Sequence, residues 1–581
     1  MIHGKSRLKF FAATVAAAVL LLNTSAPSQA QSRNFKLTQG LEIQYNILRT
    51  LATEYVDTVD FAKLINYGID AMLQSIDPYT EYVPEEDSES IELLTTASYG
   101  GIGSTIRKDS LGVMIMQTYE GSPAIRYGIE PGDIILKIDG VDCNTLTVDE
   151  CSKRMRGNPG TQVTFLIKKG RTGQIVETVV TRDKVHTSDV PYFGLLQAPD
   201  TLNIAPTGYI KLSSFTLNGS EDVRKALISL KEQGAQRIIL DLRGNGGGLM
   251  DEATDIVSLF VPKGTLVATA RGRGEGANFS CVTDKAPVDT LIPLMVLVSS
   301  SSASSSEIVA GAIQDLDRGL IVGTRTYGKG LVQSFRPVGY NGKLKLTISK
   351  YYTPSGRCIQ IMDYAHRNSD GSVGSVPDSL KQAFQTKHGR TVYDGGGITP
   401  DIEIKPEAYS RPALALSLSG ILEEYAVDFY TRNPEVPAFL PTPSAESEDI
   451  ANAGVSTSHT SVSSEDIAKA GGFKMTDQQW EDFVKYAATK KFDHRSASEI
   501  VFEQLVREAK EEGLYEQDKE AYDLLASKVK LTKEQAIEQN RDEIQPLVED
   551  EIVQKYKLTA ARIRHMLDYD SQLWKAVSSW K

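Results

Sequence analysis

The spacing of hydrophobic positions changes several times along the chain, and each change predicts a different kind of secondary structure. Between residues 35 and 95, apolar side chains recur at intervals of three and four residues, which predicts helices. From about 98 to 183, short apolar runs alternate with glycine-rich turns, and the runs that start at Val113, Ile134 and Val163 are expected strands. The pattern therefore predicts a helical region followed by a small β-rich module.

Between residues 207 and 350, strand-like apolar runs alternate with helical stretches. We expect strands at 209–212, 238–242, 294–298 and 320–322, and helices at 222–233, 250–260 and 307–316. Such alternation indicates an α/β core around a largely buried sheet. Residues 441–472 are rich in Ser, Thr, Ala, Pro and acids, which predicts a linker, and residues 473–581 return to helical spacing.

The N-terminus has the layout of a cleavable secretory signal. Basic residues within the first nine positions precede an apolar run at 10–22, and the small residues Ser28 and Ala30 follow. Cleavage is expected after Ala30. The run is shorter than the ~20 residues of a spanning helix, so an uncleaved anchor is the weaker alternative. We expect an exported protein without a stable membrane span, periplasmic in the first instance, with an extracellular location as the alternative.

Length, charge and cysteine content narrow the class of protein further. A chain of 581 residues predicts three or four folded units. Its formal net charge of −12 argues against nucleic acid as a partner, because phosphate binding needs a basic surface. The four cysteines show no zinc-binding spacing, so no metal is expected. Cys143 and Cys151 could form a disulfide or remain unpaired core residues.

A serine-rich segment at residues 299–306 joins the expected strand at 294–298 to the helix that begins near Glu307. A nucleophile at a strand-to-helix turn has its side chain held clear of the backbone. The N–H groups of the first helical turn also face any negative charge that develops there. By itself, the segment is also typical of a linker or of a helix N-cap, for which serine is a preferred residue.

The tripeptide Gly328-Lys329-Gly330 follows the buried run at 320–322. Flanking glycines allow a tight turn that presents the amine inward, although alone the tripeptide is typical of a solvated hairpin turn. Together with the serine-rich turn it predicts a serine–lysine pair, in which a neutral amine takes the serine proton. Burial can lower the amine pKa from ~10.4 to the ~7–8 that such a base needs. No histidine lies in a comparable motif.

A glycine-rich segment at residues 241–248 follows the expected strand at 238–242. Glycines let backbone N–H groups approach a ligand closely, and an oxyanion hole needs two such donors. We expect Gly246 or Gly247 to supply one donor and Ser305 the other. A plain turn is the alternative, whereas a nucleotide-binding loop is disfavoured because no Gly-Lys-Ser/Thr follows.

Segments 302–307 (Ser-Ala-Ser-Ser-Ser-Glu) and 328–333 (Gly-Lys-Gly-Leu-Val-Gln) resemble the signature of the carboxyl-terminal processing peptidases, also called tail-specific proteases. The resemblance implies Ser304 as nucleophile, Lys329 as general base and Gln333 as the residue that positions the lysine. The family usually has alanine where this chain has Ser305, and the additional serines keep Ser302 as an alternative nucleophile. Segments 351–357 and 396–401 resemble two later family segments.

The resemblance covers residues 35–405 and implies a crotonase- and ClpP-like mixed α/β peptidase core. This core would carry an inserted β-rich PDZ domain and helical N- and C-terminal regions, without metal or organic cofactor. Beyond residue 440 the resemblance fades. The expected boundaries are a signal peptide at 1–30, an N-terminal helical region at 31–96, a PDZ domain at 97–183, a serine peptidase core at 184–405, a helical extension at 406–440, a linker at 441–472 and a C-terminal helical region at 473–581.

Segments 99–103, 121–124 and 131–140 resemble a PDZ domain. Such domains bind a chain terminus by strand addition, and loop N–H groups receive its carboxylate. The loop would consist of Gly100, Gly101, Ile102 and Gly103. A small β domain without a ligand is the alternative.

The predicted function is that of an exported serine endopeptidase acting on proteins or peptides with exposed, unstructured C-termini. The alternatives are a catalytically inactive PDZ scaffold with a peptidase-like core and a ligand-binding or acyl-transferring crotonase relative. The sequence leaves the oligomeric state open, a homo-oligomer included.

Overall fold

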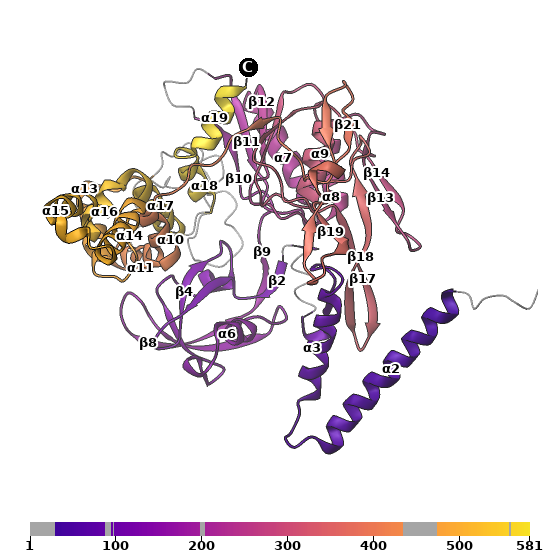
Figure 1. Ribbon diagram of the computed structural model, residues 1–581, viewed down its shortest axis with the longest axis horizontal. Coiled ribbons are helices and arrows are strands. Elements are labelled where there is room, and N and C mark those ends of the chain that lie inside the picture. Colours follow the sequence, from indigo (N-terminus) through magenta and orange to yellow (C-terminus); the bar gives the residue numbers. More distant parts are fainter. Residues whose placement is uncertain are drawn as a thin grey trace, which may run out of the picture. The chain divides into compact units, whose positions relative to one another are not determined.

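The computed structural model describes residues 29–87, 95–96, 98–197, 204–433, 473–556 and 559–580 (Figure 1). The chain divides into two compact units, Met1–Tyr82 and Val83–Lys581. The charged start and apolar run of the predicted signal peptide, and the predicted linker at 441–472, lie outside the described residues. In the described part of the chain, no helix combines the length and the hydropathy that a membrane crossing requires.

The first unit contains the helices α2 (Gln29–Glu54) and α3 (Phe61–Gln74). Asp60 caps α3, because its Oδ1 accepts a hydrogen bond from the Lys63 N–H at 3.1 Å. The predicted helical region is therefore confirmed up to Gln74. The short strand β1 (Glu81–Val83) then follows where further helix was expected. Pro78 precedes this strand, and proline is a residue that ends helices.

The PDZ-like module is a small β-sheet with short helices. Its elements are β2 (Ser98–Gly101), β3 (Ser104–Lys108), β4 (Val113–Thr118), α5 (Pro123–Arg126), β5 (Ile134–Ile138), β6 (Val141–Asp142), α6 (Val148–Met155), β7 (Gln162–Lys168), β8 (Ile175–Thr181) and β9 (Asp183–His186). The main sheet has the order β3-β4-β5-β7-β8, with β6 on β5, and β2 pairs separately with β9. The three predicted strands are confirmed, and β3 is an end strand of its sheet.

The sheet of the α/β core has the strand order β10-β11-β12-β15-β16-β23. Its strands are β10 (Tyr192–Leu195), β11 (Thr207–Lys211), β12 (Arg237–Asp241), β15 (Leu294–Val298), β16 (Leu320–Gly323) and β23 (Ile402–Glu403). From β11 to β23 all neighbours are parallel. The carboxyl ends of β12, β15 and β16 therefore meet at one edge, which brings the glycine-rich loop, the serine-rich turn and the Gly-Lys-Gly segment together.

Helices cover both faces of this sheet. On one face lie α7 (Gly219–Glu232), α8 (Met250–Ser258) and α9 (Ser305–Asp315), packed against side chains such as Ile238, Leu240 and Val296. On the other face lie α18 (Thr559–Leu567) and α19 (Ser571–Ser579), with α19 drawn in yellow beside β11 and β12 in Figure 1. Two covered faces explain why β15 is buried over its whole length and is a continuous apolar run in the sequence.

A second, antiparallel sheet was not predicted from the sequence. It contains β13 (Leu266–Gly272), β14 (Phe279–Val282), β17 (Leu331–Gly339) and β18 (Gly342–Tyr352). Tyr340 and Asn341, with φ of 47° and 54°, form the tight turn of the β17–β18 hairpin. Two smaller hairpins follow, β19 (Met362–Arg367) with β20 (Val373–Ser375) and β21 (Ala383–Gln385) with β22 (Thr391–Tyr393).

The C-terminal third is helical, as the spacing predicted. Besides α18 and α19 it comprises α10 (Arg411–Ser419), α11 (Ile421–Arg432), α13 (Asp477–Ala488), α14 (Ala497–Glu511), α15 (Lys519–Val529), α16 (Lys533–Gln539) and α17 (Arg541–Lys555). Tyr425, Trp480, Phe483 and Val548 share one apolar core. Thr476 caps α13, since its side chain accepts a hydrogen bond from the Gln479 N–H, the third of the helix.

Candidate active site

Ser304 lies immediately before α9 and has a strained backbone, with φ of 56° and ψ of −116°. A non-glycine residue keeps such a conformation only when its surroundings enforce it, and this kind of strain concentrates at functional sites. The Tyr351 hydroxyl donates to the Ser304 carbonyl at 3.2 Å. Ser304 is half-buried, which leaves part of the residue accessible at the edge of the sheet.

Ser302, the alternative nucleophile, has a different environment. It is fully buried, and its hydroxyl donates to the Leu242 carbonyl at 2.8 Å. The same oxygen accepts a hydrogen bond from the Ser299 N–H at 2.9 Å. The Ser302 hydroxyl therefore holds the turn together, and the geometry favours Ser304 over Ser302 as the reactive serine.

The Glu307 carboxylate joins the serine-rich turn to the lysine segment. Its Oε2 accepts from the N–H groups of Ser304 and Lys329, both at 2.9 Å. Its Oε1 accepts from the Gly328 N–H at 2.7 Å and the Thr326 hydroxyl at 2.6 Å. Burial raises the pKa of Glu307, against the lowering effect of these four donors. Sequence reasoning recorded this glutamate only as part of a motif and missed its role as a shared anchor.

The Gly-Lys-Gly segment is packed into the protein and is not a solvated hairpin turn. A Cβ on Gly328, whose φ is 85°, would overlap the Ile361 side chain. The Gly330 N–H donates to Gln360 Oε1 at 2.8 Å, and a Cβ on Gly330 would lie 2.8 Å from the Gln360 backbone nitrogen. Lys329 between them is half-buried. Both glycines are therefore required by close packing on either side of the lysine.

Gln333, which was predicted to position the lysine, lies on β17. Its Nε2 donates to the Thr347 hydroxyl on β18 at 3.2 Å. The pairing of the two strands shifts register between Val332 and Gln333, and such an irregularity re-aims side chains at the edge of a site. The effect of Gln333 on Lys329 stays a prediction.

The glycine-rich loop lies directly against the serine-rich turn. A Cβ on Gly247, whose φ is 103°, would lie 2.8 Å from Ser304 Cβ and 3.0 Å from the Ser305 nitrogen. The Gly247 N–H already donates to Asn245 Oδ1 at 2.8 Å. Of the two predicted donors, Gly246 is the one whose N–H has no such bond among the described residues.

Asn245 is a further residue that sequence reasoning missed. It is fully buried, and its Nδ2 donates to the Leu212 carbonyl at 2.9 Å. Its own carbonyl accepts from the Ala303 N–H at 3.0 Å and the Ser306 hydroxyl at 2.9 Å. Asn245 thereby ties the glycine-rich loop to β11 and to the serine-rich turn. The only signal in the sequence is a lone asparagine among glycines.

A buried charged pair stands at the start of the same loop. Asp241, at the end of β12, accepts hydrogen bonds from the Tyr209 hydroxyl and from Arg243 Nη2, both at 2.6 Å. Burial would raise the pKa of Asp241, but Arg243 and Lys211 outweigh it and hold the pKa well below the usual range of an aspartate. Asp241 is therefore ionised, and its charge fixes the guanidinium beside the loop.

The two later segments secure the far end of α9. Arg357 donates to Asp315 Oδ1 at 2.7 Å, and both side chains are buried. Gln314 Nε2 donates to the Thr399 carbonyl at 2.9 Å and to Asp401 Oδ1 at 2.8 Å. The helix that begins at the serine-rich turn is thus held at both ends.

The predicted carboxylate loop joins β2 to β3 in the PDZ-like module and consists of Gly100, Gly101, Ile102 and Gly103. The first two pair with β9, and the last two lead into the end strand β3. The Ile102 carbonyl accepts from the Ala124 N–H at 2.8 Å, and the Gly103 carbonyl accepts from the Tyr119 N–H at 2.9 Å. The loop therefore lies at the start of β3, an end strand of its sheet.

Comparison with known proteins identifies the family. Residues 206–364 match the family model "Peptidase family S41", and residues 114–169 match "PDZ domain". The carboxy-terminal-processing protease of Bartonella bacilliformis is 34% identical over 325 residues, which are 54% of this chain and 71% of that protein. The chain belongs to the carboxyl-terminal processing peptidases of family S41. It is a serine-type peptidase that carries a PDZ domain, and its mixed α/β fold class is as predicted.

Three further comparisons concern this peptidase. The carboxyl-terminal-processing protease of Synechocystis is 39% identical over 316 residues, 54% of this chain and 70% of that protein. The solved structure of a photosystem II D1 C-terminal processing protease is 24% identical and covers 62% of this chain and 86% of that one, with a TM-score of 0.34. Residues 458–579 match "Probable PDZ-protease, C-terminal helical domain". The likeness to known proteins therefore extends past residue 440, although the resemblance was expected to fade there.

The cysteines of the peptidase are all described and unpaired, so Cys143 and Cys151 form no disulfide in this structure. Burial raises the pKa of the Cys143 thiol to about 12, and the neighbouring Cys151 adds to the effect. The described ranges contain no group of three or more His, Cys, Asp or Glu side chains that could hold a metal ion.

Proposed function

We propose that this peptidase is an exported serine endopeptidase with Ser304 as nucleophile and Lys329 as general base. We propose further that its PDZ domain selects substrates with exposed, unstructured C-termini. The observation that carries the proposal is the buried Glu307 carboxylate, which accepts hydrogen bonds from the backbone of both Ser304 and Lys329. One anchor thus holds the two loops whose side chains must meet for proton transfer.

In this mechanism the neutral Lys329 amine takes the proton of the Ser304 hydroxyl, and the serine oxygen attacks the substrate carbonyl. The N–H groups of Gly246 and Ser305 receive the negative charge of the tetrahedral intermediate. Lys329 then returns the proton to the leaving amine. In the second half-reaction it activates a water molecule that hydrolyses the acyl-enzyme.

Substrate selection is assigned to the PDZ domain. A peptide would add as a strand to the edge of β3 (Ser104–Lys108), and its terminal carboxylate would meet the loop from Gly100 to Gly103. Binding of one chain end there raises the local concentration of the attached substrate at the active site. Unfolded segments fit this scheme because an extended strand is the form that the sheet edge accepts.

Export is inferred from the basic start, the apolar run at 10–22 and the small residues before Gln31. The expected mature protein begins at Gln31 and lies outside the cytoplasm. The periplasm is the expected location, and an extracellular location is the alternative. Terminal sequencing of the protein purified from its native cells tests this. A chain that retains its first 30 residues would contradict the cleavage.

The dyad is tested with three variants on an unfolded reporter protein. Ser304→Ala and Lys329→Met should each lower turnover by about a thousandfold or more, because the two act as one unit. Ser302→Ala is the matched control, since its buried hydroxyl bonds only to backbone groups, the Leu242 carbonyl and the Ser299 N–H. It should retain most activity and lose ~1 kcal/mol of unfolding free energy. Normal turnover by Ser304→Ala would contradict the assignment.

A further inference from the structure

The last helix of the chain is built into the peptidase sheet. Leu573, Ala576 and Val577 of α19 are buried in one cluster with Ile239 of β12 and Leu297 of β15. These two strands lead directly into the glycine-rich loop and the serine-rich turn. A parallel sheet needs cover on both faces, and the C-terminal helices supply the cover on the face opposite α7, α8 and α9.

The polar end of α19 lies on Arg243. Asp570 caps the helix, because its Oδ1 accepts from the Leu573 N–H at 2.8 Å. The same carboxylate accepts hydrogen bonds from both terminal nitrogens of the Arg243 guanidinium, from Nη1 at 3.1 Å and from Nη2 at 2.6 Å. Gln572 Oε1 accepts from Arg243 Nη1 at 3.0 Å. With Asp241 on its other edge, the guanidinium is held between β12 and the end of the chain.

Arg243 also lies in the glycine-rich segment, directly before Gly244. Its carbonyl accepts from Lys211 Nζ at 2.7 Å, and the next N–H, that of Gly244, donates to the Ser299 hydroxyl at 3.1 Å. A planar guanidinium bound on several sides has one orientation. The position of Arg243 therefore sets where the chain enters the loop that leads to Gly246.

We infer that Asp570 and Gln572 are positioning residues for peptide-bond hydrolysis: by holding Arg243 they fix the loop whose Gly246 N–H receives the oxyanion. The docked C-terminal helix is accordingly a condition for turnover and not merely an appended domain. The inference rests on the proposed function, in which Gly246 is an oxyanion donor. Oxyanion donors must be placed accurately, because a small displacement weakens their contact with charge that exists only in the transition state.

The test is Asp570→Asn in the full-length protein. Asparagine caps a helix as well as aspartate does and has nearly the same volume, but it removes the charge that faces Arg243. We expect kcat on an unfolded reporter to fall about tenfold with KM unchanged. The affinity for a peptide aldehyde, which forms a tetrahedral adduct with the serine, should fall by the same factor. Binding of a C-terminal peptide should remain as in the parent protein.

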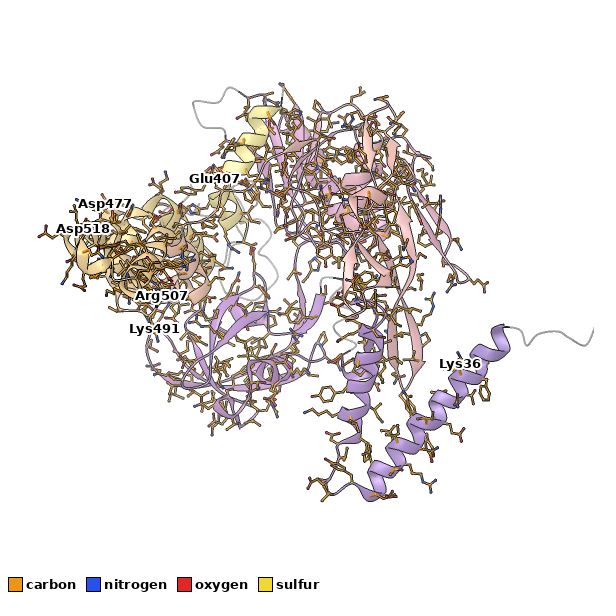
Figure 2. The ribbon with its side chains drawn as sticks, in the orientation of Figure 1. Lys36, Glu407, Asp477, Lys491, Arg507 and Asp518 are labelled. Atoms are coloured by element: carbon orange, nitrogen blue, oxygen red, sulfur yellow. The ribbon has the colours of Figure 1, made fainter. Side chains whose placement is uncertain are left out.

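The matched control breaks a different contact of the same helix. Glu407, labelled beside α19 in Figure 2, accepts from Lys575 Nζ at 2.6 Å in an exposed ion pair. Glu407→Gln breaks this tether without touching Arg243 and should leave kcat within about twofold, since exposed ion pairs contribute little. A loss of kcat in Glu407→Gln as large as in Asp570→Asn would mean that any weakening of α19 suffices, and would overturn the assignment.

Gln572→Met keeps the test decisive if Asp570→Asn lowers the melting temperature. It preserves volume and helix propensity but removes one acceptor from Arg243 and the donor from Gln572 Nε2 to the Ile404 carbonyl, and kcat should fall about threefold. If both variants turn over like the parent while Ser304→Ala is inactive, the positioning role is overturned and the proposed function stands. A parent protein that neither cleaves the reporter nor binds the aldehyde would instead overturn the proposed function.

Discussion

Two glycine-rich loops of this peptidase, residues 244–248 in the core and 100–103 in the PDZ domain, are predicted to present backbone N–H groups to an anion. The core loop is held largely by side chains, its own Asn245 and, from the serine-rich turn, Ser305 and Ser306. The described contacts of the PDZ loop are backbone hydrogen bonds within its own module, such as those from Ala124 and Tyr119.

The difference matches the two tasks. An oxyanion exists only in the transition state, so its donors lower the barrier only if they are already in place. Buried polar side chains with one satisfied arrangement provide that rigidity. In the proposed function the terminal carboxylate is already present in the ground state, so the PDZ loop would contribute affinity, and a loop held within its own module would be sufficient. Damage to the core loop should therefore lower kcat, and damage to the PDZ loop should raise KM.

The largest effect within this comparison is expected from Asn245→Ala. The change removes the bond to the Leu212 carbonyl and the acceptor that holds the Gly247 N–H. We expect kcat to fall about a hundredfold with little change in KM, and the free energy of unfolding to fall by ~1–3 kcal/mol. Steady-state cleavage of an unfolded reporter and denaturant titration measure the two quantities.

Asn245→Asp serves as the graded control for kcat, because it keeps the acceptor for Gly247. It also loses the donor to Leu212 and places a buried carboxylate oxygen against that carbonyl, so the free energy of unfolding should fall at least as far as in Asn245→Ala. It should lie between the parent and Asn245→Ala in kcat. If Asn245→Ala raised KM and left kcat intact, the two loops would not differ in the way proposed.

A smaller effect, on binding alone, is expected from Gly103→Ala in the PDZ loop. Gly103 has φ of 77°, and an added Cβ would overlap Ser122 Cβ, so the loop must shift. Affinity for a C-terminal peptide should fall about tenfold and KM should rise correspondingly, while kcat at saturation is unchanged. Calorimetry with the peptide and reporter kinetics test both parts.

Gly121→Ala separates crowding from backbone strain. Gly121 has a similar φ of 68°, but nothing lies within 4 Å of an added Cβ. It should cost ~1 kcal/mol of stability through strain and leave peptide affinity near that of the parent. Equal losses of affinity in both variants would show that the strain, and not the fit of the loop, governs binding.

The sequence was most informative where burial is complete. The strands β12 and β15 are covered on both faces, so their apolar runs stand out, and the segments that follow them necessarily meet at one edge. The sheet of β13, β14, β17 and β18 was missed because β17 is largely half-buried or exposed and has no clear alternation. Tertiary contacts decide its pairing, and local periodicity does not report them.

The residues of the candidate site likewise fall into those that the sequence predicted and those that it did not. Local turn patterns indicated the serine-rich turn and the Gly-Lys-Gly segment with Lys329, and the resemblance to the family implied Ser304 within that turn. The residues that connect the loops, Glu307 and Asn245, act through partners that are near in space and were not predicted. For α19, helical spacing shows that one face is apolar but cannot tell whether a helical bundle or the peptidase sheet covers it.

The smallest effect is expected from Ser305→Ala, which asks whether the core loop depends on each of its side-chain contacts. Ser305 is buried, and its hydroxyl donates to the Gly248 carbonyl at 2.9 Å. Its predicted role in catalysis belongs to the backbone N–H, which alanine retains. We therefore expect a loss of ~1 kcal/mol in unfolding free energy and of less than about threefold in kcat, measured beside Ser302→Ala, which loses a comparable buried bond. A hundredfold loss of kcat would instead mean that the Ser305 hydroxyl takes part in the chemistry, and the nucleophile would have to be reassigned within the serine-rich turn.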